Sequence, residues 1–175
     1  MQSSRIILAE NTYEALRHHL LPIKPRAEEA AFCFAQFRSD YGFECLEWMP
    51  VPVSDFEYRS LFHIELTDEN RAKVIKRAHD LNASIVEFHS HPRAKRAEFS
   101  SSDQSGFEEF VPHVRWRLKG RPYAAIVVTP SSFDSLLWIN DGTQPSGVLQ
   151  IQAGNQLLSP TGLTYSALVR KNVPR

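Results

Sequence analysis

The sequence is poor in cysteine, with only Cys33 and Cys45 among its 175 residues. A cysteine-based zinc site needs several thiolates at close spacing, and neither residue has a second cysteine near it in the sequence. Both stand in apolar, strand-like surroundings. We therefore expect them to pack in the core of a protein from a reducing compartment, with a disulfide between adjacent strands as the alternative.

Excess charge and long apolar runs are also lacking. The 20 basic and 20 acidic side chains balance, which argues against a nucleic-acid-binding or membrane-surface protein, because such proteins usually carry a strongly basic face. No apolar run approaches the length of a transmembrane span, and the amino terminus shows no charged-then-apolar signal pattern. Without repeats, low-complexity tracts or linkers, the sequence predicts one cytoplasmic domain over residues 1–175.

Apolar patterning predicts alternating strands and helices. Helical patterns, with apolar residues three or four positions apart, begin at Asn11, Thr67 and Ser100. Apolar runs typical of strands cover residues 30–37, 44–53, 60–66, 84–88, 123–128, 133–139 and 147–153. This order of elements predicts an α/β sandwich, in which helices flank a mixed, curved β-sheet.

Two histidines follow the buried strand predicted over residues 84–88. Side chains alternate faces along a strand, so His89 and His91 point the same way and are close enough to hold one ion. Asp103 lies at the start of the next helix and can supply an oxygen ligand. Three protein ligands leave the fourth tetrahedral position of Zn²⁺ to water, which is typical of a catalytic rather than a structural site.

Each part of this pattern also has an ordinary explanation. His89 and His91 could be surface residues beyond a strand end, and Ser100-x-x-Asp103 is a capping-box-like helix start. A capped helix start is also a rigid way to present a carboxylate, so the two interpretations are compatible. The conjunction of all four residues favours a metal site. The remaining histidines are interpreted as ordinary core or surface residues: His18, His19, His63, His79 and His113.

Zinc-dependent hydrolysis also needs a group that accepts a proton from water and passes it to the leaving amine. Glu28 and Glu29 are the best candidates, because they stand at the head of the most apolar strand; a solvated loop end is the alternative. Glu87 shares a face with the histidines and could contact a ligand. Ser100 could hydrogen-bond an oxyanion developing on a substrate carbonyl.

Together these residues resemble the JAMM (MPN-plus, Mov34/PAD-1) zinc metalloproteases. The matching residues are Glu28 with Ala31 and Ala35, then His89-Ser90-His91-Pro92, then Ser100 to Asp103. The similarity extends over about residues 26–139. It implies the cytidine-deaminase-like α/β sandwich of JAB/MPN domains, and hydrolysis of isopeptide or peptide bonds after the carboxyl terminus of ubiquitin or a ubiquitin-like protein.

The resemblance also implies a role for each residue. His89, His91 and Asp103 are implied to bind zinc, Glu28 to act as the general acid and base, and Ser100 to stabilise the intermediate.

Two departures from the family pattern have structural consequences. The segment between His91 and Asp103 is one residue longer than usual, and we expect the extra residue to bulge the loop over residues 93–96. Ala31 stands where the family usually has glycine. The position of this small residue is the reason for preferring Glu28 to Glu29 as the base.

The short form of the chain is similar to bacterial stand-alone JAB proteins, on the His89-Ser90-His91-Pro92 motif and the segment Trp116-Arg-Leu-Lys-Gly-Arg-Pro-Tyr123. These include deubiquitinase-like members of antiphage operons that also encode a ubiquitin-like protein with E1- and E2-like enzymes. The implied partner is a ubiquitin-like protein whose extended tail adds a strand to a sheet edge.

Two other functions stay open. The chain could be a JAB-like binding scaffold whose activity is gated or absent, or a peptidase that processes a ubiquitin-like sulfur carrier. Arg93, Lys95 and Arg96 could recognise an acidic patch on a partner, although a solvated loop explains them better.

Overall fold

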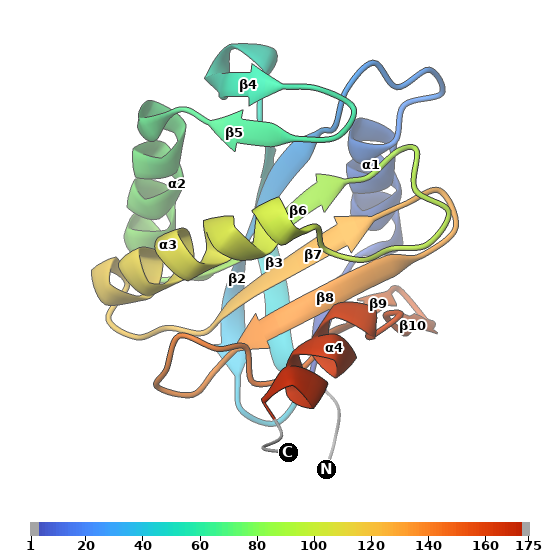
Figure 1. Cartoon of the computed structure of the whole chain (residues 1–175). Coiled ribbons are helices and arrows are strands. Elements are labelled where there is room, and N and C mark those ends of the chain that lie inside the picture. The colour runs from blue at the N-terminus through green and yellow to red at the C-terminus, as the bar shows by residue number, and fades with distance from the viewer. Residues whose placement is uncertain (1–3, 173–175) are drawn as a thin grey trace.

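The computed structural model describes residues 4–172, which form a curled, mixed sheet of eight strands (Figure 1). A separate hairpin, β4 (Phe56–Arg59) with β5 (Ile64–Leu66), lies beside it. The strands of the main sheet are β1 (Arg5–Leu8), β2 (Ala30–Arg38), β3 (Gly42–Pro50), β6 (Ser84–Ser90), β7 (Tyr123–Val128), β8 (Phe133–Trp138), β9 (Gln150–Ala153) and β10 (Gln156–Leu158). Their spatial order is β10-β9-β1-β3-β2-β6-β7-β8. β6 is parallel to β7, and β1 is parallel to β3 and β9.

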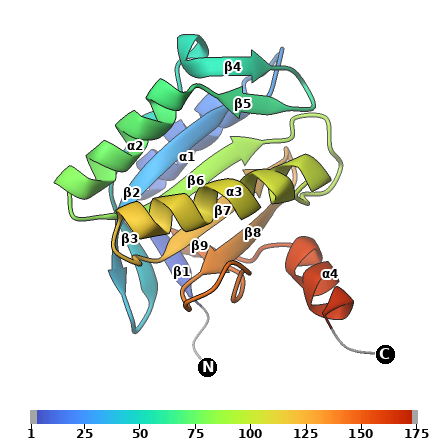
Figure 2. The same cartoon turned by 60° about the vertical axis from the view of Figure 1, so that its left-hand side comes forward.

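Helices cover both faces of this sheet (Figures 1 and 2). α2 and α3 lie on one face and α1 lies on the other, while the short α4 packs against β8. Residues 4–172 contain four α-helices, and these are α1 (Glu10–Leu20), α2 (Asp68–Asp80), α3 (Ser101–Arg117) and α4 (Leu163–Lys171). The predicted α/β class, with a mixed sheet and flanking helices, is confirmed.

The sheet separates two apolar cores. β2 is central and its first six residues are all buried, as expected of a strand with both faces covered. Phe32 and Phe34 face α2 and α3, where Val74 and Val111 complete the packing. Burying one such side chain contributes about 1.5–3 kcal/mol. The strands beneath the histidines therefore form a rigid support.

The chain passes from β6 through α3 to β7, which is the parallel neighbour of β6. The loop after β6 and the first turn of α3 consequently lie at the carboxyl end of β6. On the other side, β2 is antiparallel to β6 with Ala30 opposite His89. This register places the head of β2, with Glu28 and Glu29, beside the histidines.

The structure corrects several predicted elements. Asn11, a residue type that favours helix caps, does not cap α1. The N-cap residue is Ala9 and the helix begins at Glu10, while the Asn11 side chain accepts a hydrogen bond from the Thr12 amide. The strand predicted over residues 44–53 ends at Pro50 and a 3-10 turn follows, because Pro50 and Pro52 lack an amide donor. The strand predicted over residues 60–66 is only the short β5. β1, β4, β10 and α4 were not predicted; residues 54–59, expected to be a loop, contain β4.

Both cysteines are free. Cys33 is fully buried on β2 and Cys45 is partly buried on β3, so the core-packing interpretation is confirmed and the inter-strand disulfide is not formed. Within residues 4–172, no helix has the length and apolar character needed to cross a lipid bilayer.

Candidate metal centre

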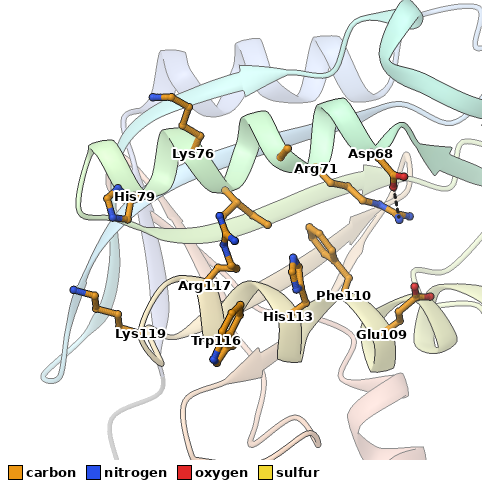
Figure 3. A pocket seen from close by; sticks show the side chains of 13 residues that line it. Asp68, Arg71, Lys76, His79, Glu109, Phe110, His113, Trp116, Arg117 and Lys119 are labelled. Atoms are coloured by element: carbon orange, nitrogen blue, oxygen red, sulfur yellow. Dashed lines mark ion pairs between the residues drawn. The ribbon is translucent and has the colours of Figure 1, made fainter.

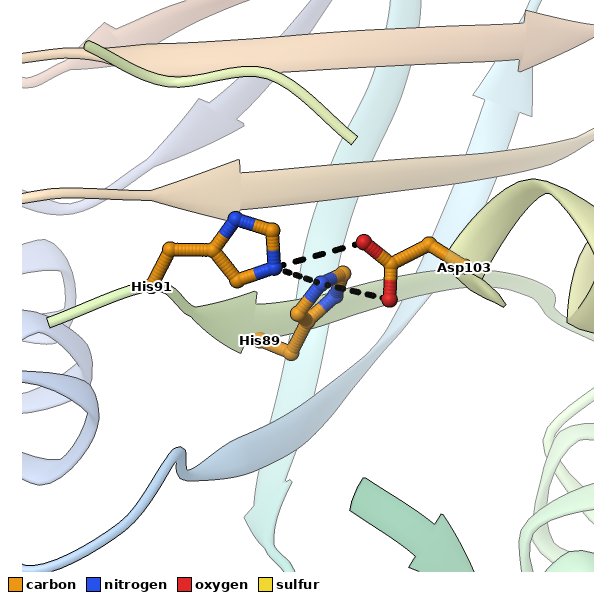
Figure 4. Close-up of side chains that lie close together, drawn as sticks. All are labelled: His89, His91 and Asp103. Atoms are coloured by element: carbon orange, nitrogen blue, oxygen red, sulfur yellow. Dashed lines mark hydrogen bonds and ion pairs between the residues drawn. The ribbon is translucent and has the colours of Figure 1, made fainter. Parts of the chain in front are cut away.

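His89, His91 and Asp103 converge at the carboxyl end of β6 and could hold a metal ion, since one ligand atom from each lies within 4.8 Å of the others. Figure 4 shows both imidazoles turned toward the carboxylate. The two Nε2 atoms are 3.3 Å apart. Asp103 Oδ1 lies 3.4 Å from His89 Nε2, and Oδ2 lies 3.3 Å from His91 Nε2. The predicted convergence of these side chains is confirmed.

Strand geometry explains why both histidines face the same way. His89 lies in β6, and the His91 amide still donates to Val128 O of β7 at 2.8 Å, so extended pairing continues past the end of β6. Ser90 consequently points to the opposite face, where it is fully buried. Its hydroxyl accepts from the Glu29 amide at 3.0 Å, and its own amide donates to Glu29 O at 3.0 Å. These bonds tie the histidine segment to the head of β2.

The third ligand is held by a helix cap. The Asp103 amide donates to Ser100 Oγ at 3.1 Å, and the Ser100 amide donates to Asp103 Oδ2 at 2.7 Å. This is a complete capping box at the start of α3. The cap orients the carboxylate toward the two histidines, so the structural and ligand interpretations of Asp103 are both satisfied.

The electrostatics of the site favour bound positive charge. Burial lowers the pKa of His89, but the charge and hydrogen bond of Asp103 outweigh this effect and raise that pKa to about 9. For Asp103, burial raises the pKa of the carboxyl, but His89 and His91 outweigh it and hold the pKa well below its usual range. A field that holds a proton on His89 also attracts a metal cation to the same nitrogen atoms.

Glu28, which the sequence analysis prefers as the base, and Glu29 face different surroundings. Glu28 is only 2 % exposed, and its Oε1 lies 3.7 Å from His91 Nε2. Burial is the main influence on this carboxyl and raises its pKa, although the two histidines act in the opposite direction. Glu29 instead forms an ion pair with Arg59. Glu28 is thus the glutamate that borders the candidate metal centre.

Ser100 lies on the same side of the centre as Glu28. Together with His91 and Phe62 they line a cavity of about 250 Å³. The Ser100 hydroxyl already accepts from the Asp103 amide, and its oxygen is 3.2 Å from Ser102 Oγ. When Ser102 is the donor in this pair, the Ser100 hydrogen is left to donate to a group in the cavity.

Glu87, whose place in a buried strand had no explanation from sequence, has a hydrogen-bond partner. Tyr123 of β7 donates its hydroxyl to the Glu87 carboxylate. Burial is the main influence on Glu87 and raises its pKa, and the bond from Tyr123 lowers it. Glu87 adds to the negative surroundings of His89 but is not among the three converging ligands.

Two residues of the site were missed from sequence. Arg59 of β4 donates from Nε to Glu28 O at 3.0 Å, in addition to its ion pair with Glu29. His63, interpreted as an ordinary histidine, has Nδ1 3.3 Å from Ser102 Oγ and Nε2 3.0 Å from Glu65. Both come from the hairpin, whose position over the site depends on tertiary contacts that no local pattern signals.

Two larger cavities lie on this side of the molecule, and one of them borders the centre. One, of about 690 Å³, is lined by His89, Asp103 and His63. The other, of about 980 Å³, is a groove between α2 and α3 (Figure 3). The groove and the metal-side cavity are adjacent, because they share lining residues from both helices: Arg71, Gly106, Glu109 and Phe110.

No protein-family model and no curated protein sequence matches this chain. The assignment of a function therefore depends on the geometry and chemistry of the site.

Proposed function

We propose that this chain is a zinc-dependent peptidase or isopeptidase of the JAMM type, with a JAB fold, that cleaves after the carboxyl terminus of a ubiquitin-like protein in the cytoplasm. The observation that carries the proposal is the convergence of His89, His91 and Asp103, with the buried carboxyl of Glu28 3.7 Å from His91. Two imidazoles and one carboxylate form the donor set of many catalytic zinc sites.

A zinc ion held by the three ligands would polarise the scissile carbonyl and lower the pKa of a water molecule. Glu28 is suited to proton transfer, because burial raises its pKa toward the range in which a carboxyl both takes and releases a proton. In the proposed reaction Glu28 takes a proton from the attacking water. It then gives that proton to the amine that leaves.

Ser100 supports the oxyanion that forms on the substrate carbonyl. Its hydroxyl can donate to the oxyanion when Ser102 is the donor in the Ser100–Ser102 pair, and the residue shares a cavity with Glu28 and His91. The capping box fixes the Ser100 backbone, so the donor is oriented before the substrate arrives. Such oriented donors are worth several kcal/mol in acyl transfer, about 2.7–4 kcal/mol for one oxyanion-hole group.

The residues that line the groove between α2 and α3 are suited to bind a partner with an acidic, partly apolar surface. Arg117 and Lys119 lie at the end of the groove that is farther from the metal-side cavity. They lie next to Trp116, which is 75 % exposed (Figure 3). Cations around an exposed aromatic ring suit carboxylates that flank an apolar side chain. We assign this groove to the body of the ubiquitin-like protein, with its tail passing into the metal-side cavity.

Reversing the charge of the groove should weaken substrate binding without slowing the chemical step. For Arg117→Glu with Lys119→Glu, we expect KM at low salt to rise about tenfold, because two exposed pairs are worth up to about 1 kcal/mol each. kcat should be unchanged, and the difference should shrink at high salt. The control is Arg38→Glu with Arg170→Glu, which makes the same charge change outside the groove. Equal KM values for the two double variants would contradict the assignment.

Arg59 should affect turnover through Glu28. Arg59→Met removes the hydrogen bond to Glu28 O and the ion pair with Glu29. We expect kcat to fall about tenfold with zinc content unchanged, since small misplacements of catalytic groups are costly. Arg77→Met is the control, because it removes a more exposed ion pair with Glu47 and neither residue lines the cavities that border the centre. Equal kcat values for Arg59→Met and wild type would show that Arg59 does not position Glu28 for turnover.

The proposed activity is tested by cleavage of a reporter protein fused to the carboxyl terminus of a ubiquitin-like protein, and of the same modifier joined to a lysine. We expect cleavage that stops with a chelator and returns with zinc. A scaffold would bind the modifier and cleave neither substrate. Cleavage restricted to a ubiquitin-like sulfur carrier would identify a processing peptidase instead. Wild-type protein loaded with zinc that cleaves none of these substrates would contradict the proposal.

A further inference from the structure

A chain of hydrogen bonds connects the C-terminal helix to the residue that precedes Ser100. The Phe99 amide donates to Thr164 Oγ1 at 3.0 Å, and the Thr164 hydroxyl donates to Asp134 Oδ2 at 2.7 Å. An amide can only donate, so the direction of both bonds is determined. Phe99, Thr164 and Asp134 are each no more than 2 % exposed. Water therefore does not compete for these groups.

Asp134 holds the start of α4 as well. Its Oδ1 accepts from the amides of Gly162 at 3.0 Å and Ser135 at 2.9 Å, and its Oδ2 also accepts from the Thr164 amide at 3.0 Å. Together with the Thr164 hydroxyl, four donors satisfy this buried carboxylate. Hydrogen bonds to an ionised acceptor are about twice as strong as neutral ones. Thr164, in the first turn of α4, is thus held by Asp134 of β8.

Phe99 connects Thr164 to the metal centre through its ring and through its backbone. Its ring lies 5.7 Å from the His89 ring, measured between centroids. Its backbone leads directly into Ser100, whose amide donates to Asp103 Oδ2, the oxygen that lies 3.3 Å from His91. A shift of the Phe99 backbone would therefore move the ligand carboxylate relative to both imidazoles.

The loop before Phe99 is otherwise exposed at Arg93, Lys95 and Arg96. Ala97 provides an earlier tether, because its amide donates to Ser132 Oγ at 2.9 Å and its carbonyl accepts from Thr161 at 2.8 Å. Of these tethers, the bond from Phe99 to Thr164 is the one made nearest to Ser100 along the loop.

We propose that Thr164 is a positioning residue for the metal centre, with Asp134 holding its hydroxyl. It acts from the C-terminal helix through the Phe99 backbone on Asp103. The inference depends on the metal-binding part of the proposed function and not on the peptidase activity.

The test compares the metal affinity of four full-length variants. Thr164→Val and Thr164→Ala remove the hydroxyl, whereas Thr164→Ser keeps it. Ser135→Ala is the matched control, because this buried hydroxyl of β8 also makes two hydrogen bonds, both 2.8 Å to Leu149, with none to the metal loop. The zinc dissociation constant is measured by competition with a chromogenic chelator. The visible absorption of the Co²⁺-loaded protein reports the ligand geometry, and thermal unfolding reports stability.

We expect Thr164→Val and Thr164→Ala to bind zinc at least tenfold more weakly, as is usual when a partner that orients a ligand is lost. Their Co²⁺ spectra should change. Thr164→Ser should retain wild-type affinity and spectrum, and Ser135→Ala should lose comparable thermal stability with no change in either. If Thr164→Val does not fold, Thr164→Ala decides, because it removes the hydroxyl without placing a methyl against the carboxylate.

Wild-type affinity in Thr164→Ala would overturn the inference and leave the proposed function intact. A loss of affinity in Ser135→Ala as large as in Thr164→Ala would also overturn it, because the effect would then be general destabilisation. Wild-type protein that binds no zinc would contradict the proposed function itself.

Discussion

Glu28→Gln is expected to lower kcat about a thousandfold while the protein still binds zinc. Glutamine has the shape of glutamate but cannot accept the proton from water, and general acid–base groups contribute about 10²–10⁴-fold. Glu28 is buried and its carboxyl is not among the three converging ligands. The neutral side chain should therefore leave zinc content and thermal stability near those of wild type. Steady-state cleavage, elemental analysis and thermal unfolding check the three expectations.

Glu29→Gln is the matched control, since the neighbouring residue undergoes the same chemical change. Glu29 pairs with Arg59 instead of facing the histidines, so its variant should keep turnover within a few-fold of wild type. Near-normal cleavage by Glu28→Gln would remove Glu28 from the mechanism. The Glu28→Gln protein should also capture uncleaved conjugates in a pull-down.

His91→Ala is expected to lose both the metal and the activity. His91 Nε2 faces His89, Asp103 and Glu28 at 3.3–3.7 Å, so alanine removes one of the three converging ligands. We expect zinc affinity to fall more than about 100-fold, since losing only a group that supports a ligand costs 10- to 100-fold. Chelator competition and cleavage assays measure the two effects.

His18→Ala is the control for this substitution, because His18 is exposed on α1, far from the ligands in sequence. It should bind zinc and cleave substrate as wild type does. If His91→Ala retained wild-type zinc affinity, His91 would not be a ligand.

The parts of the site that follow from local rules were predictable. Alternation along a strand placed His89 and His91 on one face, and the Ser100-to-Asp103 spacing predicted the helix start that the structure shows as a capping box. These relations involve residues close in sequence, so the spacing of the residues is enough to predict how their side chains are placed.

The contributions of distant segments were not predictable. Whether Glu28 or Glu29 faces the histidines depends on the pairing of β2 with β6 and on Arg59, a residue of the separate hairpin. His63 reaches Ser102 only because that hairpin lies over the start of α3. A single sequence shows no signal for such contacts.

The fold was predicted best where burial is strongest. β2 and β6 carry nearly continuous apolar runs and were placed correctly, apart from their ends. The four residues of β1 and the three of β10 are too short for their patterns to be distinguished from a loop. The start of α4 is fixed by Asp134, which is thirty residues upstream of Thr164. The sequence next to α4 therefore lacks a capping residue from which the helix start could be predicted.

The most direct test of the account is the zinc content of the purified full-length protein, measured by elemental analysis after dialysis against metal-free buffer. We expect about one zinc ion per chain, because two imidazoles and one carboxylate form the protein part of a catalytic zinc site. Protein that is folded, and yet holds no zinc and binds none from a buffered zinc solution, would contradict it.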